Sequence, residues 1–349
     1  MTRILRRRIG FELELLAPRG SSRRSLAERL GVDHDAGIRP VWHHDSEPAP
    51  VAHLGGRFLH LTQGFELVRR SGEPLCALVD DVTITADLDV AAPAPAGWLR
   101  LLTDDPRIAR LLEVTCDPGD PLDAVLEPVA ALWDEPIETV GSVRRLDARG
   151  ATVALAAPSG SERERPCEVV TPPITAGHHA ALEALLAPAR DLGFTVPAEA
   201  AVHLHVDGAP FRDASALANL IRLFGWWRQP LRQLFGTNPA CKRLKALPEA
   251  LVSLVEGTPT YDALVAAAKA GGLSKFYDVN LTQVLRPDPV RDTVEIRILP
   301  GAIDAGCVIE QAAVLEALLD RCLEAKPIPR PGESNEAAEF ASWLAGHDS

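Results

Sequence analysis

The chain has 349 residues, of which 46% are hydrophobic and 24% charged, values close to those of folded globular proteins. Its formal net charge of −12, with no block of basic residues after Arg8, argues against a nucleic-acid surface as its main function. The six cysteines show no C-x-x-C spacing, so they indicate neither a zinc knuckle nor a disulfide-dense scaffold. We therefore expect reduced thiols in a cytoplasmic protein.

The start of the chain is not expected to target a membrane. The opening MTRILRRRIGFELELL is basic, but Glu12 and Glu14 interrupt what would have to be the apolar region of a signal peptide. No uncharged apolar run of about 18 residues, the length that a membrane span needs, occurs elsewhere. The sequence thus predicts no membrane partner.

Strands and helices follow one another along the chain without strict alternation. Apolar runs and period-two alternation predict strands at 9–16, 58–61, 76–79, 167–170, 201–206, 276–285 and 292–299. Helical spacing of apolar residues is strongest at 178–192, 213–235, 260–270 and 304–323. This order predicts an α+β fold around one sheet rather than repeated βαβ units.

Two segments interrupt this predicted core. Residues 89–166 are rich in Pro, Ala and Asp, contain an expected helix at 121–133, and are interpreted as an insertion or subdomain. The Pro-rich and Gly-containing start of 324–349 predicts a C-terminal tail with a short helix. The expected arrangement is one domain over 1–323 followed by this tail.

Five of the predicted strands combine an apolar face with a face of charged or polar groups, because side chains at i and i+2 point the same way. A solvated outer face is the simplest interpretation of any one such strand. Here, however, the polar positions are mostly Glu, His, Asn and Arg, the residue types that bind metals and phosphates. They are Glu12, Glu14, Glu168, His203, His205, Asp278, Asn280, Thr282, Glu295 and Arg297.

If these strands share one sheet, four carboxylates converge with Arg297 as a nearby cation. Like charges at short range are strongly unfavourable, so the pattern predicts a bound cation. Carboxylates with one or two imidazoles favour Mg²⁺ or Mn²⁺ over zinc, and such an ion commonly binds phosphate oxygens. Arg297 would then contact a phosphoryl group and Lys275 would add a point charge. The pattern indicates nucleotide-dependent phosphoryl transfer, although the chain has neither a P-loop nor a strand–G-x-G-x-x-G–helix unit.

These motifs, taken in order, resemble the amidoligase family of the carboxylate–amine ligase superfamily, which is related to glutamate–cysteine ligase and glutamine synthetase. The similar segments are GFELE at 10–14, EVVTPP at 168–173, HLHVD at 203–207, KFYDVN at 275–280 and TVEIRILPG at 293–301. The sequence departs from the family pattern at VDDVTI, the nearest counterpart of an Asp-Gly-Ser-like turn, and after the final glycine, where a Thr is often found. These departures concern the acceptor-substrate site more than the nucleotide site.

The resemblance implies a curved, mainly antiparallel sheet with helices on its outer face, as in the catalytic domain of glutamine synthetase. It implies ATP and Mg²⁺ as cofactors, with Mn²⁺ as an alternative ion. The implied substrates are a small-molecule or peptide carboxylate and an amine or ammonia, joined through an acyl phosphate. Related ligases are often dimers or larger, so a homo-oligomer is a further expectation.

The resemblance also implies a role for each matching residue. The expected metal ligands are Glu12, Glu14, Glu168, Glu295 and His205. The expected nucleotide contacts are His203, His205, Asn280 and Arg297. The residues expected to act on the transferred group are Arg297, Asn280 and Lys275.

Two other functions stay open at this point. A phosphotransferase on the same fold would stop after phosphorylation, and a non-catalytic module would bind metal or nucleotide without turnover. The chain retains Glu12, Glu14, Glu295 and Arg297, which favours an active enzyme. The histidine pairs His43–His44 and 178–179 are interpreted as surface residues.

Overall fold

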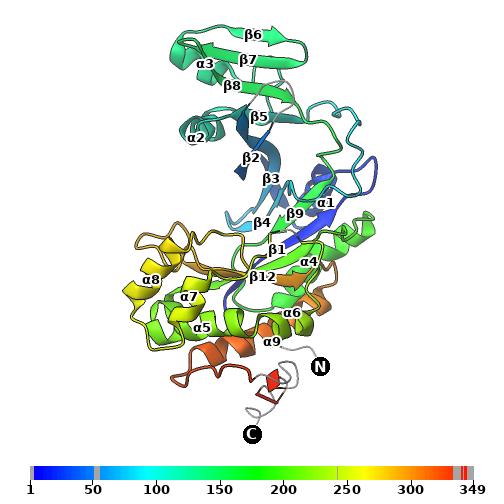
Figure 1. Cartoon of the computed structure of the whole chain (residues 1–349). Helices are drawn as coiled ribbons and strands as arrows, with labels where there is room; N and C mark the ends of the chain where they lie inside the picture. The colour runs from blue at the N-terminus through cyan, green and yellow to red at the C-terminus, as the bar shows by residue number, and fades with distance from the viewer. Residues whose placement is uncertain (1–3, 51–55, 242, 333–338, 341, 344–349) are drawn as a thin grey trace. The chain divides into compact units, whose positions relative to one another are not determined.

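The computed structural model describes residues 4–50, 56–241, 243–332, 339–340 and 342–343. Helices combine there with antiparallel strands in an open sheet, which confirms the predicted α+β class (Figure 1). The likeness to glutamine synthetase stays a prediction. The chain divides into two compact units, described separately below. The first consists of Met1–Leu13, Pro173–Leu186 and Glu199–Ser349, and the second of Glu14–Pro172 and Ala187–Ala198.

The first unit contains an antiparallel set of strands in the order β11, β12, β10, β1. Their bounds are Val279–Asn280 for β11, Thr293–Pro300 for β12, Ala201–Asp207 for β10 and Ile9–Leu16 for β1, which continues into the second unit. The helices are α4 (His178–Asp191), α5 (Ala214–Trp226), α6 (Arg228–Phe235), α7 (Glu249–Leu254), α8 (Tyr261–Ala270) and α9 (Ala305–Cys322), with a short 3-10 helix at Ala209–Arg212.

The apolar faces of these strands are buried as the alternation predicts. Val202, Leu204 and Val206 of β10 are each about 1% exposed, as is Ile298 of β12. Figure 1 shows α5, α6 and α9 layered beneath the strands of this unit. The helices therefore cover one face of the strands, and the charged side chains belong to the other.

The single helix predicted over 213–235 is instead two helices. Asp213 caps α5 by accepting hydrogen bonds from the backbone N–H groups of Ser215 and Ala216. The helix then breaks at Trp227, because Pro230 has no N–H to donate to the preceding turn. The chain restarts as α6 with Pro230 in its first turn, where a missing donor costs little.

The strand predicted over 276–285 is also shorter than expected. Only Val279 and Asn280 pair with β12, and a turn begins directly afterwards. The Asn280 side-chain oxygen accepts hydrogen bonds from the backbone N–H and the hydroxyl of Thr282, at 3.0 and 2.6 Å. This local side-chain bonding ends the strand, as Asn commonly does in turns.

The segment that leads into β1 is held by α9 and α4. The backbone N–H groups of Arg6 and Arg7 donate to Glu316 of α9 at 2.9 and 2.7 Å. The His178 ring lies 3.0 Å from the backbone oxygen of Arg7 and packs edge-on against Phe11. The prediction that His178 lies on the surface is therefore wrong, because the ring fills the space beside β1 and is only 4% exposed.

The second unit is built on a longer antiparallel set of strands in the order β9, β4, β3, β5, β8, β7, β6, with β2 paired along β3. Their bounds are β2 (Ala36–Pro50), β3 (Arg57–Arg69), β4 (Pro74–Val79), β5 (Leu99–Thr103), β6 (Ile137–Val140), β7 (Val143–Ala148), β8 (Ala151–Pro158) and β9 (Pro166–Val170). The helices are α1 (Arg23–Asp33), α2 (Pro106–Thr115) and α3 (Glu127–Trp133).

One face of this sheet forms the apolar core of the second unit. Leu59, Leu61 and Leu101 lie there with buried residues of α2 and α3. Residues 89–166 all belong to this unit, and their interpretation as an insertion stays a prediction, as do the boundaries 1–323 and 324–349. The expected helix at 121–133 is confined to α3. Among the residues that the structure describes, no helix has both the length and the apolar character to cross a membrane.

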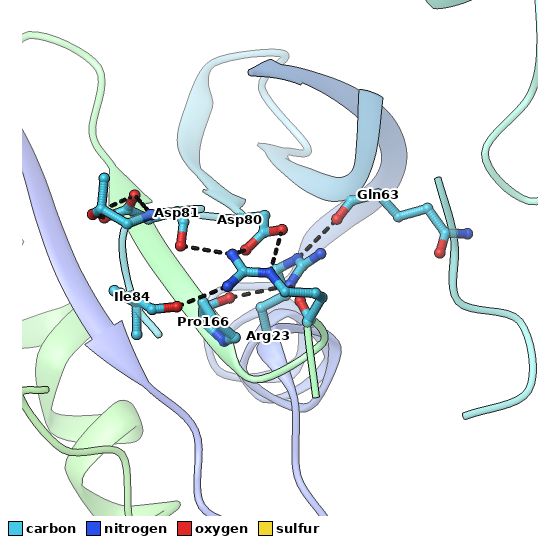
Figure 2. A network of polar contacts seen from close by, with 8 residues as sticks. Arg23, Gln63, Asp80, Asp81, Ile84 and Pro166 are labelled. Carbon is cyan, nitrogen blue, oxygen red and sulfur yellow. Dashed lines mark hydrogen bonds and ion pairs between the residues drawn. The ribbon is translucent and has the colours of Figure 1, made fainter. Parts of the chain in front are cut away.

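A fully buried arginine ties α1 to the strands of the second unit (Figure 2). The guanidinium of Arg23 donates to the backbone oxygens of Gln63, Arg163 and Pro166 at 2.8, 2.6 and 3.1 Å. It also lies over the Trp98 ring, 4.6 Å from the ring centroid. Because these contacts reach β3 and the start of β9, one side chain fixes the entry of the strand that carries Glu168.

A second arginine completes this network. Arg163 pairs with the buried Asp80 carboxylate and donates to the backbone oxygens of Ile84 and Asp81, both at 2.7 Å. Arg23 itself forms no ion pair with another described residue, and burial lowers the pKa of its guanidinium although the nearby Asp80 carboxylate raises it. The network is thus held mainly by carbonyl groups that would otherwise be buried without a donor.

We expect Arg23→Met to lower the free energy of unfolding by about 2–4 kcal/mol, because it leaves buried backbone oxygens without donors. Urea unfolding followed by circular dichroism would measure this loss. Arg29→Gln is the matched control, since its ion pair with Asp33 on the same helix is exposed and contributes about 0.5 kcal/mol or less. Equal losses in the two variants would contradict the role given to Arg23.

Candidate functional site

Strand register in the first unit brings five predicted site residues into neighbouring positions. Glu12 of β1 lies opposite His203 of β10, and His205 of β10 lies opposite Glu295 of β12. Asn280 of β11 lies opposite Glu295 on its other side. Directly opposed residues share a face, so side chains from all four strands meet on the face away from the helices.

Glu12 lies between the two imidazoles. Its Oε2 is 3.1 Å from Nδ1 of His203, in a hydrogen bond, and its Oε1 is 2.9 Å from Nε2 of His205. The second pair of atoms is close enough for an ion pair but lacks hydrogen-bond alignment, since Nε2 of His205 has no hydrogen-bond partner. Glu12 is therefore the common neighbour of both rings.

Glu295 is held by an amide and a guanidinium. Asn280 donates from Nδ2 to its Oε2 at 2.7 Å, and Arg297 forms an ion pair with its Oε1. The same Oε1 lies 3.7 Å from Nδ1 of His203. Glu12 and Glu295 are therefore joined through His203 into one cluster.

A β-bulge lies at the centre of this cluster. Val202 is opposite Leu299, whereas Leu204 is opposite Ile296, so Arg297 and Ile298 together face His203. A bulge of this kind bends the strand and increases its local twist, and bulges are common beside active sites. It occurs at the position from which the Arg297 side chain reaches back to Glu295.

Burial and charge act against each other on the two carboxyl groups. The Glu12 and Glu295 side chains are 17% and 8% exposed, which alone would raise their pKa values. His203 and His205 outweigh burial and hold the pKa of Glu12 well below its usual range. Arg297, followed by His203, outweighs burial at Glu295 and lowers its pKa. Both groups are thus anionic near neutral pH.

The two imidazoles respond in opposite directions. Burial, with the positive charge of Arg297, lowers the pKa of His203 and favours a neutral ring. Burial also acts to lower the pKa of His205, but the Glu12 carboxylate overcomes this effect and raises it. His203 therefore orients Glu12 as a neutral ring. His205 binds a proton more readily than a free imidazole does.

Glu12, His205 and Glu295 are the residues of this unit best suited to hold a metal ion. One ligand atom from each lies within 4.8 Å of the other two. Two carboxylates and one imidazole suit Mn²⁺ and Mg²⁺ with positions left open for other ligands. Hydrogen bonds from His203 and Asn280 fix the carboxylate orientations, as supporting residues commonly do at metal sites.

The remaining predicted residues are Lys275, Glu14 and Glu168. The Lys275 ammonium lies 5.4 Å from the centroid of the Phe276 ring. Glu14 and Glu168 belong to the second unit, where Glu14 is buried and Glu168 lies on β9 opposite Val79. Their assignment as metal ligands stays a prediction, as does a catalytic role for Lys275.

The sequence did not reveal an arginine pair that supports Arg297. Asp278 is 1% exposed and accepts hydrogen bonds from Arg228 at 2.6 Å and Arg232 at 2.9 Å, both on α6. Its backbone oxygen accepts a hydrogen bond from the Arg297 N–H at 3.0 Å. Burial raises the pKa of Asp278 although both arginines act to lower it. The signal available in the sequence was the four-residue spacing of Arg228 and Arg232, since residues four apart share one face of a helix.

We expect Glu295→Gln to weaken Mn²⁺ binding at least about tenfold, because it replaces an anionic ligand with a neutral amide. Calorimetric titration of the purified chain with MnCl₂ would measure the affinity. Glu310→Gln is the control, since Glu310 is an exposed residue of α9. An unchanged affinity in Glu295→Gln would remove this residue from the metal site.

A comparison with protein families adds independent support. The model of the family described as "Putative amidoligase enzyme" matches residues 134–319, more than half of the chain. The matched segment contains His203, His205, Asn280, Glu295 and Arg297, while Glu12 lies outside it. No curated protein matches the chain, and no solved structure does. The chain belongs to the amidoligase family, as its motifs predicted.

Proposed function

We propose that this protein is an ATP-dependent ligase that joins a carboxylate to an amine through an acyl phosphate. Family membership gives the coarse class, an amidoligase enzyme. The observation that carries the finer proposal is the cluster in which Glu12, His205 and Glu295 converge beside Arg297. Two ionised carboxylates beside a fixed guanidinium suit a metal–triphosphate ligand better than a neutral one.

Glu12, Glu295 and His205 are the residues that would hold Mg²⁺, or Mn²⁺ in its place. The bound ion would neutralise phosphate charge as the phosphoryl group moves. His203 and Asn280 keep the two carboxylates oriented through hydrogen bonds at 3.1 and 2.7 Å. The protein thus supplies oriented anions in advance, which lowers the cost of reorganisation during the reaction.

Arg297 would act on the phosphoryl group. Its guanidinium is paired with Glu295 and its side chain is 11% exposed, so its orientation is restricted. Asp278 holds the Arg297 backbone N–H and is itself held by two arginines of α6. A guanidinium anchored in this way is preorganised for the negative charge that spreads over the phosphoryl oxygens in the transition state.

The proposed chemistry has two steps. An oxygen of the substrate carboxylate bonds to the γ-phosphorus as the bond to ADP breaks, which gives an acyl phosphate. The amine nitrogen then bonds to the acyl carbon as phosphate leaves, and the nitrogen releases a proton. The acid is a small molecule or a peptide, and the amine is ammonia or a primary amine; these substrates, a cytoplasmic location and a homo-oligomeric state remain proposals.

The first test is nucleotide binding. We expect a non-hydrolysable ATP analogue to bind the parent protein only with Mg²⁺ present, and Glu12→Gln to weaken that binding at least about tenfold, since it removes an anionic ligand. Calorimetric titration with and without Mg²⁺ measures both effects, with Glu310→Gln as the control. Metal-independent binding of equal strength in Glu12→Gln and parent would refute the proposed site.

Turnover provides the second test. We expect Arg297→Ala to reduce phosphate release from ATP about 100-fold or more in the presence of an active acid and amine, with a smaller change in analogue affinity. The assay screens carboxylic acids with and without amines. Phosphate release that requires the amine supports the ligase, whereas a phosphorylated acid that accumulates equally without amine identifies a phosphotransferase.

A further inference from the structure

The second unit has its own polar face on the sheet that carries Glu168. Thr62 of β3 lies opposite Arg100 of β5, so their side chains share a face. His60, two residues before Thr62 on β3, shares that face as well. The residues between them, Leu59 and Leu61, point to the apolar core formed with α2 and α3. Arg100, Thr62 and His60 are therefore directed away from that core.

Register also connects this group to Glu168. Glu168 lies opposite Val79 of β4. The pairing of Phe65 with Leu78 places Gly64 beside Val79, and Gly64 shares a face with Thr62. One face of the second unit thus has the Glu168 carboxylate on β9. The same face has Arg100, Thr62 and His60 on β3 and β5, and these three residues are called the basic group below.

Gly64 lies between these two ends. A Cβ atom on Gly64 would lie 3.0 Å from the Leu78 backbone oxygen and 3.1 Å from a Val79 methyl carbon, so this position has no room for a larger residue. Ala157 of β8 lies opposite Arg100 on its other side. On the same face Leu102 lies opposite His60 and belongs to a small buried apolar cluster with Leu155 and Ala157.

The basic group holds polar atoms that the protein itself does not bond. Nε of Arg100, Nε2 of His60 and Oγ1 of Thr62 are buried and have no hydrogen-bond partner among the described residues. Each such atom lowers the stability of the folded protein when it stays unbonded. Three of them lie on two adjacent strands of one face, which is rare in a folded protein.

The charge of Arg100 also favours a bound anion. Within the described part of the chain Arg100 forms no ion pair, and burial and the positive charge of Arg163 lower its pKa. Burial, followed by the charge of Arg100, lowers the pKa of His60 to about 4, so this ring is neutral at pH 7. A partly buried cation that has no acid beside it, in a protein of net charge −12, attracts an anion.

We propose that Arg100 and Thr62, beside the neutral His60 ring, bind an oxyanion, either the phosphate or the carboxylate group of a small molecule. The guanidinium can donate two parallel hydrogen bonds to such a group, and the Thr62 hydroxyl can donate one more. The site stands on residues of the second unit alone. If the bound molecule is the acid substrate, that acid carries an anionic group besides the carboxylate that is phosphorylated. This identification of the bound molecule rests on the proposed function.

The alternative is that Arg100 has only a structural role, and stability distinguishes the two. An arginine placed for packing contributes to stability, whereas one placed for a ligand costs stability when the ligand is absent. Arg144 is the control, because it lies on β7 of the same sheet, on the opposite face from Arg100, and is paired with Asp123.

The experiment measures melting temperature of the full chain in Mg²⁺-free buffer, with inorganic phosphate in one series and malonate in another. At about ten times the dissociation constant, the bound anion is expected to raise the melting temperature of the parent by about 3–6 °C. Arg100→Gln is expected to melt at or above the parent without anion and to lose that rise. Arg144→Gln is expected to keep the rise in full.

Each outcome decides the proposal. A rise with phosphate alone identifies a phosphate group, and one with malonate alone a carboxylate. No rise in the parent with either anion, or an equal rise in Arg100→Gln, overturns the site. Glu12→Gln is expected to keep the anion-dependent rise, so failure of the metal–nucleotide site and failure of this site give different results.

Discussion

The first unit depends on one electrostatic constraint, which is the burial of two carboxylates on the two strands that flank β10. Moving an ionised carboxylate out of water costs several kcal/mol unless charges and hydrogen bonds replace the solvent. Glu12 has His203 and His205, and Glu295 has Asn280 and Arg297. In the strand order β11, β12, β10, β1, strand β10 lies between the two carboxylates, and its histidines lie close to both.

Much of this site was predictable because side-chain direction in a strand follows from sequence spacing alone. The i and i+2 positions of Glu12, His203, His205, Glu295 and Arg297 gave the correct face in each case. Register was not predictable, since it depends on pairing between distant segments and on the bulge opposite His203. The support from α6 to Asp278 was missed for the same reason, because contacts between a helix and a loop are tertiary.

The parts of the fold that sequence reasoning missed had weak local patterns. Strand β8 reads ATVALAAP, in which alanines lower the contrast between its two faces, so the alternation that marks a strand is faint. β2 contains Pro40 and a histidine pair, which suggested a loop. His178 was placed on the surface because polar residues at helix starts are common, whereas its ring packs against Phe11 and fixes the chain before β1.

Two kinds of buried arginine occur in this protein. Most donate to oxygens of the protein itself and have a structural role, whereas Arg100 does not do so within the described residues and is assigned to a ligand. Arg23 donates to three backbone oxygens, and Arg163 combines a carboxylate with two more. Arg228 and Arg232 share Asp278. In each case oxygens of the protein replace most of the water that the guanidinium lost, and only Nη2 of Arg23 among these donors is buried without a partner in the described residues. Arg100 is buried to a comparable degree without such replacement in the described residues, so the free energy spent in placing it there is recovered only when an anion binds.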